Sequence, residues 1–149
     1  MTTPLAPGEM AGRVRAAGID GVIGVEGDSL IVEPPDILEI AAFLKKTPGI
    51  DLDYLTHITA IDYRDRFELV YLLSSLAHNH SLVIRTRLPD REFPSLPSVV
   101  SLWKGADYQE REIFDLFGIR FDDHPNMKRI FLWEGFEGHP LRKDFVNGA

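Results

Sequence analysis

Apolar residues in the N-terminal half of the chain recur at helical spacing in two stretches. Residues 9–17 predict a short helix that Gly18 ends, and residues 37–46 predict a second helix that Asp36 can cap. The apolar face of the second helix consists of Ile37, Ile40, Ala41 and Leu44. Because a helix with one apolar face must bury it, we expect both helices to pack on a sheet.

Segments rich in Val, Ile, Thr and Tyr alternate polar and apolar side chains, as strands do. The segments expected to form strands are residues 22–25, 30–32, 52–63, 67–74 and 82–88. The last three predict an antiparallel meander with one solvated and one covered face. The predicted fold class is therefore α+β, with a mixed, mainly antiparallel sheet, helices packed on one face and an irregular C-terminal tail.

No linker, repeat or low-complexity block divides the chain, so we expect a single domain over residues 1–149. The lead, residues 1–7, is expected to be flexible because its two prolines oppose regular structure. The α/β body is expected at residues 8–98. A helix is expected at residues 99–118 and an irregular tail at residues 119–149.

One carboxylate lies in the apolar stripe of the helix predicted at residues 99–118. The stripe comprises Trp103, Ala106, Ile113, Phe114 and Phe117. Glu110 falls within it, whereas Glu112 and Asp115 are predicted to point away from it. Because an unpaired buried charge is costly, we expect Glu110 to pair with a basic residue. The candidates are Arg111, Lys128, Arg129, Arg142 and Lys143.

The dipeptide His-Pro occurs twice after this helix, as His124-Pro125 and His139-Pro140, each followed by basic residues. Since proline opposes helix continuation, both segments should be extended or turning. The tail is expected to fold back onto the domain and to contact a partner protein. The aromatic anchors predicted for that contact are Trp133, Phe136 and Phe145.

Composition excludes several kinds of function. The chain has no cysteine, which rules out thiolate-held iron–sulfur clusters and cysteine catalysis in it. Its net charge of −7 argues against nonspecific nucleic-acid binding and against direct adhesion to anionic lipid. No stretch reaches the roughly 20 apolar residues that span a bilayer, and no signal sequence is recognised. We therefore expect a soluble cytoplasmic protein that reaches a membrane only through partners.

The histidines leave two hypotheses from other classes open. His124 and His139, each beside acidic residues, could serve a metal-dependent hydrolase. Neither an HExxH motif nor a compact histidine triad is present, and we favour structural turns. The second of these hypotheses is a free-standing acidic binding module. We predict no catalytic, cofactor-binding or metal-binding residue in this chain.

The C-terminal third carries a long, ordered set of residues that we predict to be structural or to form an interface. They are Glu110, Arg111, Glu112, Asp115, Phe117, Gly118, His124, Pro125, Arg129, Gly138, His139, Pro140, Leu141, Arg142, Lys143 and Asp144. This set resembles the signature of the C subunit, the 30 kDa type, of the respiratory NADH:quinone oxidoreductase, complex I.

The resemblance implies a structural, cofactor-free subunit in the peripheral arm of a proton-translocating enzyme. FMN, iron–sulfur clusters, NADH and quinone would then bind to partner subunits. It further implies contacts with the D-like, quinone-site subunit and with iron–sulfur subunits, on the cytoplasmic side of a prokaryotic cell membrane. The alternative is the equivalent subunit of a related membrane-bound hydrogenase or of another donor:quinone complex.

Overall fold

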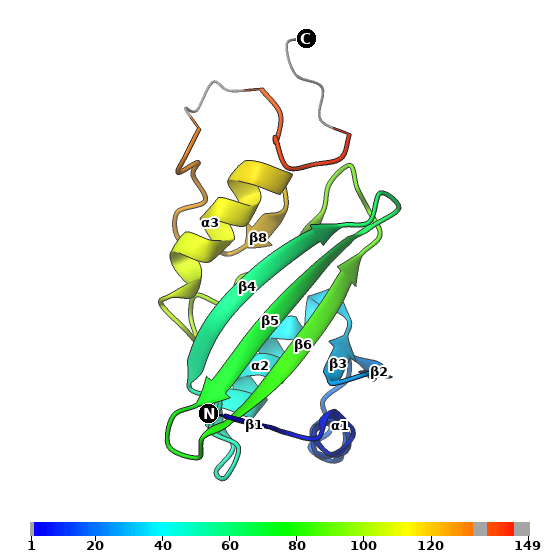
Figure 1. The fold of residues 1–149 in the computed structure, drawn as a ribbon, viewed down its shortest axis with the longest axis vertical. Helices are drawn as coiled ribbons and strands as arrows, with labels where there is room; N and C mark the ends of the chain where they lie inside the picture. Colours follow the sequence, from blue (N-terminus) through cyan, green and yellow to red (C-terminus); the bar gives the residue numbers. More distant parts are fainter. Residues whose placement is uncertain (1, 133–136, 145–149) are drawn as a thin grey trace.

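The computed structural model describes residues 2–132 and 137–144, and within them a twisted sheet carries helices on one face (Figure 1). The strands are β1 (Thr3–Pro4), β2 (Val22–Glu26), β3 (Ser29–Val32), β4 (Tyr54–Asp62), β5 (Phe67–Ser75), β6 (His80–Leu88), β7 (Ser95–Pro97) and β8 (Arg120–Asp122). The helices are α1 (Pro7–Ala16), α2 (Ile37–Lys46) and α3 (Ala106–Phe117), and a short 3₁₀ helix, η1 (Pro34–Asp36), precedes α2.

The main sheet is mixed, with the strand order β2-β3-β6-β5-β4 and with β1 added beside β6. Strands β4, β5 and β6 pair antiparallel in sequence order, which confirms the predicted meander. Strand β3 pairs parallel with β6, from Ser29 opposite Val83 to Val32 opposite Thr86. The prediction of an α+β fold with a mixed, mainly antiparallel sheet is confirmed.

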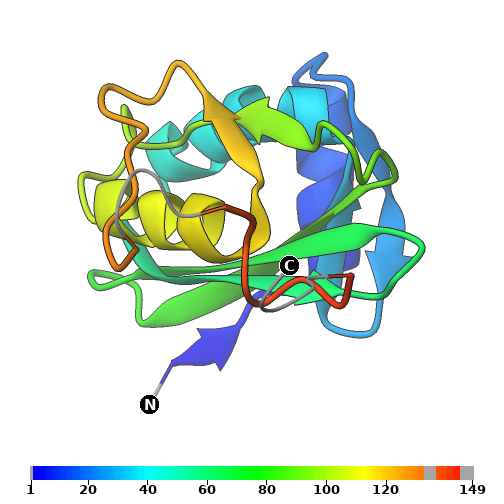
Figure 2. The same cartoon turned by 90° about the horizontal axis from the view of Figure 1, so that it is seen from above.

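The helices α1, α2 and α3 all lie on one face of this sheet (Figure 2). The predicted face of α2 is buried against it. The strands contribute alternating buried residues to the same core, including Leu69, Tyr71 and Leu73 of β5. The opposite face is polar in part, since Glu68 pairs there with Arg85 and Arg87. The predicted division into a covered and an open face is therefore correct.

The lead is more ordered than predicted, because Thr3–Pro4 forms β1 alongside the start of β6. The amide groups of Thr3 and Leu5 donate to the carbonyl oxygens of Asn79 and Ser81, at 2.9 and 2.7 Å. Pro4 lies between the two donors and has no N–H group. The proline therefore fits at the edge of the sheet, where its missing donor is not needed.

The last helix is shorter than predicted and begins at Ala106 instead of Val99. Residues 99–103 form a separate turn, closed by the Trp103 N–H group and the Val99 carbonyl oxygen at 3.0 Å. Gly105, a poor helix former, separates this turn from α3. Trp103 is still buried in the core, as its place in the apolar stripe predicted.

Two short strands were not predicted, and one of them lies in the tail that was predicted to be irregular. Ser95–Pro97 and Arg120–Asp122 pair parallel as β7 and β8. Parallel neighbours need a crossover, and α3 provides it. The tail therefore begins with a strand, and its other described residues, 123–132 and 137–144, are irregular. Among the described residues, no helix has the length and apolar character needed to cross a bilayer.

Candidate functional site

Helix α3 presents a row of polar side chains to the tail, which we define as residues 119–149. Asp107, Arg111 and Asp115 are four residues apart and therefore share one face of the helix. The described part of the tail runs along α3 after β8 (Figure 1). Each of the three side chains contacts it.

Asp115 makes the most extensive contact with the tail. Its Oδ2 atom accepts hydrogen bonds from the N–H groups of Ile130, Phe131 and Leu132, at 3.2, 2.8 and 3.1 Å. Its Oδ1 atom lies 3.0 Å from Nε of Arg129. The Asp115 side chain is 0% exposed and that of Arg129 is 8% exposed. Three amide donors and an arginine compensate the buried charge, so one carboxylate fixes four consecutive tail residues.

Arg111 and Asp107 fasten the tail closer to the start of α3. Arg111 Nε donates to the Lys128 carbonyl oxygen at 3.0 Å. Asp107 Oδ1 lies 3.0 Å from Nε2 of His124. Nδ1 of His124 accepts the N–H group of Asn126 at 2.9 Å, which places the ring proton on Nε2, facing Asp107. The first His-Pro segment is thus held to the helix at two levels.

The second His-Pro segment caps the C-terminus of α3. The last carbonyl groups of a helix lack donors within the helix, and three of them bind the tail here. The three bonds run from His139 Nδ1 to Asp115 O (2.9 Å), from Leu141 N to Leu116 O (2.9 Å) and from Arg142 Nη1 to Phe117 O (3.4 Å). The cation of Arg142 also complements the helix dipole. Burial lowers the pKa of His139, which favours its neutral form.

Gly118 is required both by its backbone and by the His139 ring. Its φ of 79° lies in the left-handed region, where a side chain is unfavourable. A Cβ atom at this position would also lie 2.7 Å from Cδ2 of His139. The glycine that ends α3 therefore makes room for the second His-Pro segment.

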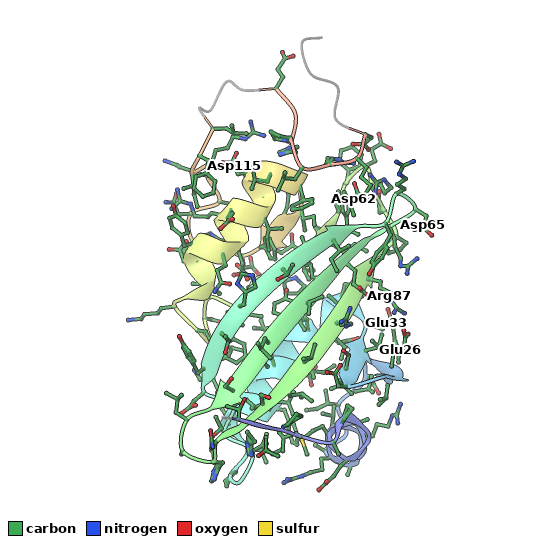
Figure 3. All side chains as sticks on the ribbon, in the orientation of Figure 1. Glu26, Glu33, Asp62, Asp65, Arg87 and Asp115 are labelled. Atoms are coloured by element: carbon green, nitrogen blue, oxygen red, sulfur yellow. The ribbon has the colours of Figure 1, made fainter. Side chains whose placement is uncertain are left out.

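A second buried carboxylate, not predicted from the sequence, binds the tail at Lys143. The side chain of Asp62, the last residue of β4, is 2% exposed, and both its oxygens bind the Arg91 guanidinium, at 2.5 and 3.0 Å. It also accepts the N–H groups of Lys143 and Arg64, at 2.8 and 2.7 Å. Hydrogen bonding from Arg91 holds the pKa of Asp62 well below its usual range. Figure 3 shows Asp62 and Asp115 at the ends of β4 and α3 that face the tail.

Asp144 and Arg142 complete this second attachment. Arg142 Nε lies 2.9 Å from Asp144 Oδ1, and Arg91 Nη2 lies 3.2 Å from Asp144 Oδ2. Arg142 also donates to the Arg91 carbonyl oxygen at 2.6 Å. Both guanidinium groups lie over the Phe67 ring, 4.6 and 5.0 Å from its centroid. The basic residues at the end of the tail are therefore partly engaged within the chain.

The partner predicted for Glu110 is wrong. Glu110 is fully buried, but its carboxylate accepts hydrogen bonds from Ser98 Oγ at 2.5 Å and from the Val99 N–H group at 2.9 Å. Burial raises the pKa of Glu110 to about 7, and the two hydrogen bonds act in the opposite direction. Glu110 therefore holds the loop before α3 in place. Its carboxylate binds a hydroxyl and an amide of that loop in place of a basic side chain.

The five predicted partners of Glu110 are used differently. Arg111 binds the carbonyl oxygen of Lys128, and Arg129 binds Asp115. Arg142 binds Asp144 and the end of α3, and Lys143 donates its backbone N–H group to Asp62. Asp115 lies on a different face from the apolar stripe, but that face is not exposed, because the tail covers it and buries the carboxylate. Glu112 is half-buried and lines a cleft of about 220 Å³ between α3 and β4.

The structure places the remaining predicted residues around these contacts. Phe117 packs edge-on against Phe67, with ring centroids 6.3 Å apart. Pro125 is exposed beside His124, and Pro140 is half-buried beside His139. Gly138 accepts a hydrogen bond from Arg129. The predicted aromatic anchors Trp133, Phe136 and Phe145 lie outside the described residues.

The two histidines do not come together. His124 contacts Asp107 near the start of α3, whereas His139 contacts Asp115 near its end. Eight residues of helix separate these points, a distance of about 12 Å. Within residues 2–132 and 137–144, no three His, Cys, Asp or Glu side chains form a group that could hold a metal ion. The structure therefore gives each histidine a separate contact between α3 and the tail.

Comparison with known proteins places the chain among respiratory enzyme subunits. Residues 30–149 match the family described as respiratory-chain NADH dehydrogenase, 30 Kd subunit. The chain is 42% identical to the C subunit of NADH-quinone oxidoreductase from Roseiflexus castenholzii, over 92% of this chain and 82% of that protein. It is 44% identical to the C 2 subunit of NADH-quinone oxidoreductase from Rhizobium meliloti, over 76% of this chain and 63% of that protein.

A solved structure shares the fold as well. The chain is similar to one in the membrane-bound sulfane sulfur reductase, an archaeal respiratory membrane complex, with a TM-score of 0.71 and 25% identity. The similarity covers 93% of this chain and 85% of that chain.

Proposed function

Because the chain belongs to the 30 Kd subunit family of respiratory-chain NADH dehydrogenase, we propose that it is a structural subunit of the complex I type of NADH:quinone oxidoreductase. In this proposal it is the C subunit, located in the peripheral arm. The enzyme passes electrons from NADH through FMN and iron–sulfur clusters to quinone and translocates protons. All these cofactors and substrates bind to partner subunits.

One feature of the tail carries the structural part of the proposal: a fixed backbone that presents exposed apolar side chains. Asp115 binds the amide groups beside Phe131, and the Leu116 carbonyl oxygen accepts the N–H group of Leu141. Yet the side chains of Phe131 and Leu141 are 56% and 53% exposed. A surface that is ordered before association loses less conformational entropy on binding, so it suits a permanent protein contact.

The proposed partners are the D-like, quinone-site subunit and the iron–sulfur subunits. The chain would lie on the cytoplasmic side of a prokaryotic cell membrane and reach it only through them. Its net charge of −7 supports attachment through proteins over direct attachment to anionic lipid.

A second candidate is the equivalent subunit of a related respiratory complex with another donor, such as a membrane-bound hydrogenase. The observation that favours it is the similarity to a chain of the archaeal sulfane sulfur reductase complex, at 25% identity. The much higher identity to NADH-quinone oxidoreductase subunits, 42% for the Roseiflexus protein, supports the first candidate.

Affinity purification from membranes of the source organism tests the proposal. A tagged copy of the full chain should co-purify with a large assembly that oxidises NADH and reduces quinone. Recovery of the tagged chain alone would contradict membership of any such assembly. Recovery with an assembly that oxidises hydrogen but not NADH would support the second candidate instead.

A further inference from the structure

Three cations line a cleft where the β4–β5 turn meets the tail. The cleft has a volume of about 250 Å³ and is lined by Arg64, Arg91, Lys143 and Asp144. Pockets for drug-sized ligands and cofactors generally start at about 300 Å³. The cleft therefore has the size for one side chain of another protein.

The charged groups of the cleft divide into engaged and free ones. The Arg91 guanidinium binds Asp62 and Asp144, and the Asp144 carboxylate binds Arg91 and Arg142. Arg64 and Lys143 are exposed, and their side chains have no partner among the described residues. Two positive charges with no partner in residues 2–132 and 137–144 therefore line the cleft, in a protein whose net charge is −7.

A single buried carboxylate positions both free cations. Asp62 Oδ1 accepts the Arg64 N–H group and Asp62 Oδ2 accepts the Lys143 N–H group, at 2.7 and 2.8 Å. Arg64 and Lys143 are far apart in the chain, so only the tertiary structure brings them together. Asp62 thus fixes the backbone on both sides of the cleft before any ligand arrives.

The backbone of Arg64 has a conformation that is unfavourable for a residue with a side chain. Its φ of 74° lies in the left-handed region, which disfavours residues other than glycine and asparagine. Strain of this kind persists where surrounding contacts impose it, here the hydrogen bond to Asp62. The conformation holds an arginine beside the cleft at a cost that glycine would avoid.

We infer that this Arg64–Lys143 cleft binds an Asp or Glu carboxylate presented by a neighbouring subunit. The inference rests on the proposed function, because it requires an assembly. Arginine and lysine are suited to a carboxylate as charge-assisted donors. A membrane surface fits less well, since the acidic side chains of Asp144 and the exposed Asp65 stand beside the cations and would repel an array of anionic head groups.

Zero-length carbodiimide cross-linking of the assembled complex provides the first test. The reagent joins a lysine amine to a carboxylate only when the two are in contact. Peptide mapping is expected to find Lys143 joined to an Asp or Glu of another subunit, and Arg64→Glu is expected to lower that product about tenfold. If Lys143 is joined only to residues of its own chain, or to none, the inference is wrong.

Charge variants provide the second test, by the fraction of this subunit that stays in the complex during a salt wash. Arg64→Glu and Lys143→Glu should each increase its loss about tenfold, whereas Arg13→Glu on the exposed side of α1 should not. Arg64→Gly should raise the melting temperature of the isolated chain and still weaken retention, since it removes both the strain and the charge. Retention of all variants equal to wild type would overturn the inference.

The outcomes also separate this inference from the proposed function. A wild-type chain that never enters a respiratory complex contradicts both. If the wild-type chain enters the complex and the charge variants are retained equally well, only the inference about the cleft is contradicted. If the isolated chain binds phosphatidylglycerol vesicles and Arg64→Glu abolishes this binding, the ligand of the cleft is a lipid phosphate and the inference of a protein carboxylate is wrong.

Discussion

Asp115 and Arg129 form an ion pair between α3 and the tail, with Oδ1 and Nε 3.0 Å apart and both side chains nearly inaccessible to water. The same carboxylate accepts the next three backbone amides. The tail is therefore attached through a buried charge that is compensated on both its oxygens.

We expect Asp115→Asn to loosen the tail. The substitution keeps the size of the side chain but removes the buried charge that faces the Arg129 guanidinium, which should lower the free energy of unfolding by about 3 to 5 kcal/mol. Denaturant unfolding measures the change, and faster tryptic cleavage after Lys128 and Arg129 locates it. Glu112→Gln, on the same helix, is the control and should change neither. Unaltered stability and cleavage in Asp115→Asn would show that the pair is not an anchor.

We expect Gly118→Ala to destabilise the chain by about 2 kcal/mol or more. The left-handed backbone costs about 1 to 2 kcal/mol for a residue with a Cβ atom, and displacement of His139 adds to this. Gly105→Ala is the matched control, because its φ is −63° and open space surrounds its Cβ position. The control should be neutral or slightly stabilising. Equal effects of the two substitutions in denaturant unfolding would argue against the packing of His139 on Gly118.

The lowered pKa of Asp62 predicts that the free energy of unfolding decreases in acid. Its pKa is lowered in the folded chain, so the stabilisation is present above the ordinary value of 3.8 and is lost as the pH falls below it. Unfolding measurements between pH 6 and about pH 3 should show this decline, and Asp62→Asn should remove part of it. Asp65→Asn changes an exposed carboxylate in the same turn and should keep the slope. An identical slope in all three proteins would contradict the assignment.

The raised pKa of Glu110 predicts the opposite pH dependence, with the free energy of unfolding decreasing as the pH rises. Its folded pKa of about 7 exceeds the ordinary value of 4.5, so the folded chain binds the proton more tightly than the unfolded chain. Stability should therefore fall by about 3 kcal/mol as the pH rises from 4.5 to 7 and then level off. Glu110→Gln carries no titrating group, so this part of the pH dependence should vanish. A Gln variant with the wild-type profile would place the titration elsewhere.

The sequence was sufficient for the fold class and for the prediction that the tail folds onto the domain, because both leave periodic or compositional signals. The apolar face of α2 and the alternation of β4 to β6 each specify a buried side. The two His-Pro dipeptides likewise predicted a tail folded onto the domain. The start of α3 was missed because Trp103 continues the helical spacing through a turn that ends at Gly105.

Which carboxylates bind the tail could not be predicted from the periodicity of the sequence. A helical wheel identifies the face that apolar side chains cover, and Glu110 lies on that face of α3. Asp115 is buried by backbone amides of the tail, which leave no hydrophobic pattern. Asp62 is likewise matched with Arg91 and Lys143, at separations of 29 and 81 residues. Such long-range polar contacts appear only when the tertiary structure brings the segments together.

The most direct test of the account is the amount of this subunit in the purified respiratory complex when Asp115 is changed. Quantitative mass spectrometry of complexes from cells carrying wild type, Glu112→Gln or Asp115→Asn gives the number of copies per complex. We predict wild-type occupancy for Glu112→Gln and about tenfold lower occupancy for Asp115→Asn, because the interface would no longer be held in place. Full occupancy in an Asp115→Asn complex whose tail is open to protease would contradict the account.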